Sequence, residues 1–158
     1  MNIKMDKNQI DVLKIYYGYF ELHSRQRLSC FNYFIAISSI ILGAYGNILL
    51  KNGGAFYFEL LFAILLFSIS FVFLRIDLRN KHLIKHSENV IIKYEDILVN
   101  ENLKLFKNEE IYSSDIKSNL NYLNRHMYSH SQLYKTIYLI YKIIAIGIFI
   151  SCFRYLKF

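Results

Sequence analysis

Long blocks of hydrophobic residues alternate with charged blocks along the chain, and this pattern predicts helices that cross a membrane. Three stretches are mainly apolar: residues 33–50, 55–74 and 137–153. A helix that spans a bilayer needs about 20 mainly apolar residues, with about 17 as the lower limit. We therefore expect three transmembrane helices, the third within residues 136–158.

The first two apolar stretches are predicted to form a hairpin, because only KNGG, residues 51–54, separates them. A connection this short makes the two helices antiparallel, so residues 33–74 form one transmembrane hairpin. Basic residues flank the hairpin on one side: Lys14, Arg25, Arg27, Arg75, Arg79, Lys81 and Lys85. Since Lys and Arg favour the cytoplasmic side, we expect the amino terminus and residues 75–135 in the cytoplasm, at the bacterial inner membrane.

The segments outside the membrane also show helical spacing. Residues 1–32 carry apolar side chains at steps of three or four, which predicts an amphipathic helix that leads into the first span. Apolar residues seven apart continue the second span beyond Leu74. Residues 100–112 lose the pattern and are predicted to connect to a returning helix, with Ser113 or Ser114 as its N-cap. Residues 75–135 are thus expected to form an antiparallel helical stalk in an all-α integral membrane protein.

On a helical wheel, the stalk has a basic edge and an acidic edge. With Arg75 placed at zero, four more basic residues fall within about 40° of it: Arg79, His82, His86 and Lys93. Three acidic residues cluster near 200–220° from Arg75, with an apolar stripe between the edges. Contact between a basic edge and a neighbour's acidic edge would be head-to-tail and could close a ring. The predicted oligomer interface contains Asp77, Leu83, Glu88, Val90, Glu95 and Ile97. Alternatively, both edges only solvate an amphipathic helix.

The first span carries small and polar residues on one face. They are Asn32, Ala36, Ser39, Gly43, Gly46 and Asn47. Lipid does not solvate amide side chains, so this face must meet another helix or water. Close helix packing is one interpretation and a pore lining is the other. Glu59 and Lys142 lie in the other two spans, where an ionisable residue is a candidate for a pore-lining or gating role. The alternative is that each reaches the water at the membrane surface.

Candidate chemistry beyond this is sparse. No catalytic motif such as GxSxG, a P-loop, GxGxxG or HExxH occurs, so neither an enzyme nor a cofactor is predicted. His82/His86 and His126/His130 have a spacing that can chelate a metal, but no carboxylate or cysteine stands at a recognised offset, and we predict no metal site. Cys30 and Cys152 are read as small buried hydrophobic residues. The net charge of +7 comes mainly from residues beside the apolar blocks, which argues against binding of duplex nucleic acid.

Three segments resemble a known group of proteins. They are YFELHSRQRLSCFNYFIAISSIILGAYG, FLRIDLRNKHLIKHSENVI and YSHSQLYKTIYLIYK. Together they are similar to the RipA-like small oligomeric membrane proteins of bacteria and to SLATT- and Hailong-type membrane effectors of phage defence. The most specific pieces are the R-x-D-x-R-N-x-x-L-I-x-H-x-E run at 75–88 and the Ser-His-Ser before the last span. The resemblance implies a ring-like homo-oligomer, a tetramer or larger, and a partner nucleotidyltransferase that makes a nucleotide-derived signal.

These observations lead to two hypotheses of different classes. The first is a gated ion channel that acts as an abortive-infection effector, in which the basic edge senses an anionic nucleotide and the polar face of the first span lines the path. The second is a non-conducting membrane scaffold that recruits partner proteins through its cytoplasmic helices. Leucine at Gly43 and Asn47 separates them, because only a channel depends on both those positions and the basic edge.

Overall fold

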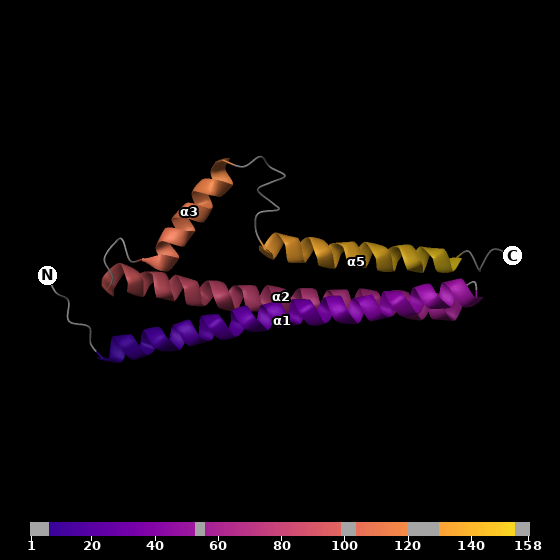
Figure 1. Cartoon of the computed structure of the whole chain (residues 1–158), viewed down its shortest axis with the longest axis horizontal. Helices are drawn as coiled ribbons and strands as arrows, with labels where there is room; N and C mark the ends of the chain where they lie inside the picture. Colours follow the sequence, from indigo (N-terminus) through magenta and orange to yellow (C-terminus); the bar gives the residue numbers. More distant parts are fainter. Residues whose placement is uncertain (1–6, 53–55, 99–103, 120–129, 154–158) are drawn as a thin grey trace. The chain divides into compact units, whose positions relative to one another are not determined.

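The computed structural model of the protein describes residues 7–52, 56–98, 104–119 and 130–153, and nearly all of them are helical (Figure 1). The helices are α1, Lys7–Asn52; α2, Phe56–Leu98; α3, Leu105–Asn119; and α5, His130–Cys152. No strand occurs in these described ranges. The prediction of an all-α protein is confirmed.

Helices α1 and α2 are long, with 46 and 43 residues. The chain has no proline, so no residue removes a backbone donor or clashes with the preceding turn. Each of these helices contains an apolar window long enough to cross a membrane, and so does α5. Only 11%, 22% and 17% of the three windows are buried within the chain. Their exposed apolar side chains therefore need lipid or neighbouring subunits as partners.

The described contacts divide the chain into two compact units. Unit 1 comprises residues 1–27 and 78–130, and unit 2 comprises residues 28–77 and 131–158. Helices α1 and α2 contribute residues to both units. The unit boundaries differ from the predicted segment boundaries after residues 32, 74 and 135, and the assignment of segments to lipid or cytoplasm stays a prediction.

Unit 2 is built from segments of α1, α2 and α5. Phe34 of α1 packs against Phe73 of α2, and Tyr45 packs against Phe62. Because the partner numbers fall as the α1 numbers rise, the two segments are antiparallel, as the short connection predicts. A second set of aromatic contacts, Phe31–Tyr134 and Phe34–Tyr138, runs in the same order on α1 and α5, so these segments are parallel.

The core of unit 2 lies where α2 meets α5. Ala63 and Leu66 of α2 are buried together with Ala145 and Ile148 of α5. Alanine at facing positions lets two helices approach closely, which is how helices in membranes commonly gain packing contacts. Partly buried residues pack around this cluster: Ile41, Leu42, Tyr45, Tyr141 and Ile144.

Unit 1 contains the beginning of α1, the end of α2 and α3. The ring of Phe106, at the start of α3, lies 5.7 Å from the ring of Tyr17 and 5.2 Å from that of Phe20, both on α1. Aromatic pairs at such separations add to the stability gained from burial. One aromatic side chain thus holds the first turn of α3 against α1.

The start of α3 corrects one prediction. Residues 100–112 were expected to form a connection, but α3 begins at Leu105. Ser113 and Ser114 lie inside the helix instead of capping it, and their hydroxyls donate to the carbonyls of Glu110 and Ile111. Serine can bond to a carbonyl of the preceding turn in this way. Residues 120–129, which hold most of the predicted returning helix, lie outside the described residues.

The buried face of α2 is more polar than its sequence pattern predicts. Its buried residues recur at steps of three, four and seven: Glu59, Ala63, Leu66, Ser70, Asp77, Asn80, Ser87, Ile91 and Glu95. The hydroxyls of Ser70 and Ser87 donate to the carbonyls of Leu66 and Leu83 on their own helix. These serines therefore need no partner on another helix, because buried polar groups need only one satisfied hydrogen bond.

Candidate functional site

One face of α1 in unit 2 is polar and is not covered by the other residues that the structure describes. We call Asn32, Ser39, Gly43, Gly46 and Asn47 the polar face; all are exposed except Gly46, which is half-buried. A Cβ atom added at either glycine would meet no atom of the chain within 4 Å beyond its own helix. Packing within the protomer therefore does not account for this face, and a neighbouring subunit or water must satisfy it.

Glu59 and Lys142 do not join the polar face. Glu59 is 3% exposed, and its carboxylate accepts a hydrogen bond of 2.7 Å from the hydroxyl of Ser151. The ammonium of Lys142 lies 5.5 Å from the centre of the Phe71 ring, within the range of a cation–π interaction. Both residues therefore link α2 to α5 inside unit 2, and a gating role for them stays a prediction.

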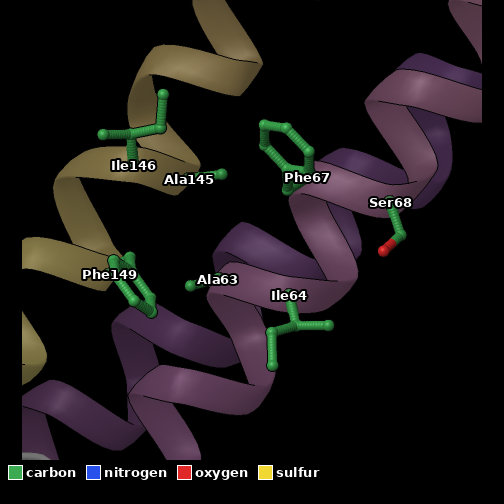
Figure 2. A pocket seen from close by; sticks show the side chains of 7 residues that line it. All are labelled: Ala63, Ile64, Phe67, Ser68, Ala145, Ile146 and Phe149. Atoms are coloured by element: carbon green, nitrogen blue, oxygen red, sulfur yellow. The ribbon is translucent and has the colours of Figure 1, made fainter.

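An apolar groove of about 290 Å³ opens between α2 and α5 in unit 2 (Figure 2). Ala63 and Ala145 belong to the buried cluster between the two helices, and Phe67 and Phe149 line the groove beside them. The other lining residues are Ile64, Ser68 and Ile146. An apolar surface of this kind suits a lipid chain or the side chains of another helix, and it offers no group for chemistry.

The predicted ligand-binding residues are exposed on α2. In unit 1 we call Arg79, His82, His86 and Lys93 the basic row, and all four are exposed. The ring of His86 lies 6.5 Å from that of Tyr16 on α1. Four cationic or titratable groups on one exposed face attract anions. Arg75 is also exposed, on the part of α2 that belongs to unit 2.

The predicted acidic edge of α2 faces the interior of the chain. Asp77 and Glu95 are 1% and 3% exposed, and Glu88 pairs with Lys85 at 3.2 Å. The remaining members of the predicted oligomer interface are Leu83 and Val90, which are half-buried, and Ile97, which is 58% exposed. The wheel placed the acids on one edge, but it could not show that this edge packs within the protomer. Their contact with another subunit stays a prediction.

Glu95 instead caps α3. Its two carboxylate oxygens accept hydrogen bonds of 3.2 Å from the backbone N–H groups of Phe106 and Lys107. The first N–H groups of a helix have no partner within the helix. A negative charge at that end also interacts favourably with the helix dipole. No local sequence pattern indicates this cap, because the capping carboxylate belongs to another helix.

Asp96 extends the same contact. Its carboxylate accepts hydrogen bonds from the ammonium groups of Lys104, at 3.0 Å, and Lys107, at 2.6 Å. The hydrogen bonds from Lys107 and Lys104 lower the pKa of Asp96 below its ordinary value. Burial, helped by the charge of Glu95, raises the pKa of Tyr17. We call Glu95, Asp96, Lys104, Phe106 and Lys107 the α3 clasp.

A second ionic contact joins α3 to α2, farther along α3 than the clasp. The ammonium of Lys85 lies 3.2 Å from carboxylate oxygens of both Glu88 and Glu110. Burial acts to lower the pKa of Lys85, but the hydrogen bonds and charges of the two carboxylates outweigh it and raise that pKa. Since Glu110 lies on α3 and Lys85 on α2, this pair ties the two helices together beyond the clasp.

The described residues hold no group of three or more His, Cys, Asp and Glu side chains that could bind a metal ion. His82 and His86 are both exposed. His126 and the side chain of His130 lie outside the described part of the chain. Cys30 is half-buried and Cys152 buried, and both are free thiols.

Comparison with known proteins identifies the family. The profile of the octameric membrane protein family (8xMP) matches residues 10–154. The chain belongs to this family. The match covers both units, so the prediction of a small oligomeric membrane protein is confirmed, and the 8xMP chain is a membrane protein that assembles as a homo-oligomer.

The 8xMP chain is also similar to an individual bacterial protein. It is 35% identical over 102 residues to CD-NTase-associated protein 19 of Escherichia coli. The aligned region covers 65% of this chain and 64% of that relative, so the chain spans somewhat less than two thirds of the relative's length. No solved structure matches the chain.

Proposed function

We propose that this 8xMP chain is the membrane effector of a bacterial anti-phage system and forms a gated path for ions across the inner membrane. Its likeness to a CD-NTase-associated protein supports a partner nucleotidyltransferase, whose nucleotide product is the signal. The family is described by its membrane assembly, which fits an effector that carries out no reaction of its own. Opening the path during infection would stop the growth of the infected cell.

The polar face of α1 is the observation that carries this proposal. It lies within a helix that is apolar and long enough to cross a membrane, yet Asn32, Ser39, Gly43 and Asn47 are exposed. An amide group exposed to hydrocarbon costs several kcal/mol, on the order of the cost of an unmade hydrogen bond there. In an oligomer this cost is avoided if the polar faces of several subunits together surround a water-filled path. Glycine at positions 43 and 46 keeps the path free of side chains.

In this proposal the basic row controls the opening of the ion path. Its four side chains are exposed, and a row of basic side chains attracts an anion. An anionic nucleotide bound there would neutralise positive charge on the row and change how α2 packs. Because α2 is a single helix from Phe56 to Leu98, a change in its packing can extend along the helix into the apolar window. The excess of basic residues beside the hairpin ends supports a cytoplasmic location for the row, where a nucleotide signal would be made.

Ion flux from liposomes tests the channel directly. The purified chain is reconstituted in potassium-loaded liposomes of bacterial phospholipids, and potassium release is measured alone, with each of a panel of cyclic nucleotides, and after their removal. We expect release in one of these conditions and none from liposomes without protein. Absence of release in every condition contradicts the channel.

Two matched glycine substitutions separate a path along α1 from a general effect on the membrane helices. Gly43 and Gly147 are both exposed, and a Cβ at either one meets no atom within 4 Å beyond its own helix. Gly43→Leu should reduce potassium release by at least about tenfold, because a bulky apolar side chain narrows and dries a pore. Gly147→Leu on α5 should leave it nearly unchanged. A scaffold predicts instead that both variants keep biological activity while Arg79→Glu abolishes it.

A further inference from the structure

One side of α3 is exposed and has a regular pattern. Residues 105, 108, 112, 115 and 119 follow one another at heptad spacing, and all five are exposed. The members of this outer face are Leu105, Asn108, Tyr112, Asp115 and Asn119. Leu105 is 75% exposed and Tyr112 is 67% exposed, which is unusual for two large apolar side chains on one short helix.

The outer face cannot turn toward its own α2. The opposite side of α3 is fixed there by Phe106, by the hydrogen bond between the backbone of Lys107 and Glu95, and by the pair Lys85–Glu110. Side chains about half a turn from these contacts point away from the described residues of α1 and α2 in unit 1. These described parts of unit 1 therefore leave the outer face open to another molecule.

The basic row on α2 has the same spacing. Arg79, His82, His86 and Lys93, together with Asn89, are five exposed residues at the same heptad positions as the outer face of α3. Each stripe covers 15 residues of helix, and its first and last Cα atoms are about 21 Å apart along the axis at 1.5 Å per residue. Two helical stripes with heptad spacing and equal length can pack side by side along their whole length.

The two stripes are also complementary in charge. The outer face carries the carboxylate of Asp115, and none of its five residues is basic. Exposed Glu109 lies at the border of this face, on the side of Leu105 and Tyr112. The basic row carries Arg79 and Lys93 and no acid. The exposed ring of Tyr112 offers a surface on which a guanidinium or imidazole group can stack. Two acids of the predicted acidic edge of α2, Asp77 and Glu95, are buried within the chain and are not available for this contact.

We infer that in the assembled protein the outer face of α3 of one subunit packs on the basic row of α2 of the neighbouring subunit. Two complementary surfaces that cannot meet within one chain make a head-to-tail contact, and such contacts close into rings. Membership of an octameric family supplies the second copy. The acidic partner of the basic row is then α3 of the neighbour instead of α2. This contact does not depend on whether the ring conducts ions, and an anionic nucleotide that binds the basic row would compete with it.

Cross-linking of the full-length oligomer tests the contact. In a background of Cys30→Ser and Cys152→Ala, the pair His86→Cys and Tyr112→Cys is treated with a short bismaleimide in mild detergent. We expect a ladder of covalent species up to the full oligomer on a denaturing gel, and none from either single cysteine. Lys14→Cys, exposed on α1, replaces His86→Cys in the control pair. Absence of the ladder, or an equal ladder from the control pair, overturns the inference.

Charge exchange supplies an independent measurement. Lys93→Glu and Asp115→Lys should each raise by about tenfold or more the protein concentration at which the oligomer dissociates, because each reversal replaces attraction between the two stripes by repulsion at every interface. The double variant should restore the wild-type value. Lys14→Glu is the control and should have no effect. Oligomer mass is measured by native mass spectrometry on variants with unchanged circular dichroism. No weakening by the single reversals, or no rescue by the double variant, contradicts the contact.

Discussion

The cap that Glu95 provides for α3 leads to a quantitative prediction. Glu95→Ala removes the acceptor of two backbone hydrogen bonds, from Phe106 and Lys107. Loss of an N-cap costs about 0.5–2 kcal/mol, and hydrogen bonds to a charged group contribute about 1.5–3 kcal/mol each. Water can satisfy the freed N–H groups in part, so we expect a cost of about 2 kcal/mol for the docking of α3, at the upper end for a single cap.

Hydrogen exchange measures this cost locally. When an opened segment recloses faster than its amides exchange with solvent, the exchange rate of an amide follows the opening equilibrium of that segment. A cost of about 2 kcal/mol corresponds to roughly 30-fold faster exchange, at 1.4 kcal/mol per factor of ten. Peptides that cover the start of α3 should show this acceleration by mass spectrometry, whereas the apolar window of α5 should not.

Two variants sharpen the result. Glu95→Gln keeps the shape of the side chain and one carbonyl oxygen, so it should accelerate exchange by a smaller factor than Glu95→Ala. Glu109→Ala changes an exposed acid on α3 and should stay within about 0.5 kcal/mol of the wild type. Unchanged exchange at the start of α3 in Glu95→Ala would refute the assignment of Glu95 as the cap.

Two further predictions concern single contacts. Ser151→Ala removes the hydroxyl that binds buried Glu59 and should destabilise the helices against unfolding in dodecyl sulfate by about 1 kcal/mol, while Ser68→Ala, an exposed serine, should have no measurable effect. The hydrogen bonds from Lys107 and Lys104 hold the pKa of Asp96 below its ordinary 3.8, so Asp96 stabilises the clasp above that pH and this contribution is lost as the pH falls through the lowered pKa. Protection of α3, corrected for intrinsic exchange, should therefore not change with pH near pH 7, where Asp96 stays ionised, and should fall only in acid. A wild-type acid response in Asp96→Asn would contradict this.

The membrane helices were predictable because their signal is local. Long apolar stretches, a connection of a few residues and the absence of proline fix helix type and antiparallel order without knowledge of tertiary contacts. The exposed polar face of α1 was also visible, since Asn and Gly residues recur at helical spacing. The structure adds that the chain itself does not cover this face.

The stalk was harder to predict, because its decisive contacts join different helices. A wheel gives the angle of Glu95 on α2, but not that α3 begins beside it and supplies two N–H groups. The serine pair at 113 and 114 is a common N-cap signal, yet the helix starts earlier because Glu95 and Phe106 stabilise its first turn from outside. The spacing of apolar residues likewise did not indicate that serines, Ser70 and Ser87, lie on the buried face of α2.

Accessibility of the polar face to water tests the central claim most directly. Single cysteines at Ser39, Gly43 and Asn47, and at Gly147 as the control, are introduced into the background without native cysteines. The protein in proteoliposomes is then treated with a charged, membrane-impermeant thiol reagent. The account predicts modification at the three α1 positions when ions flow, and none at Gly147→Cys. Protection of all three α1 positions while ions flow would show that the face does not line the path.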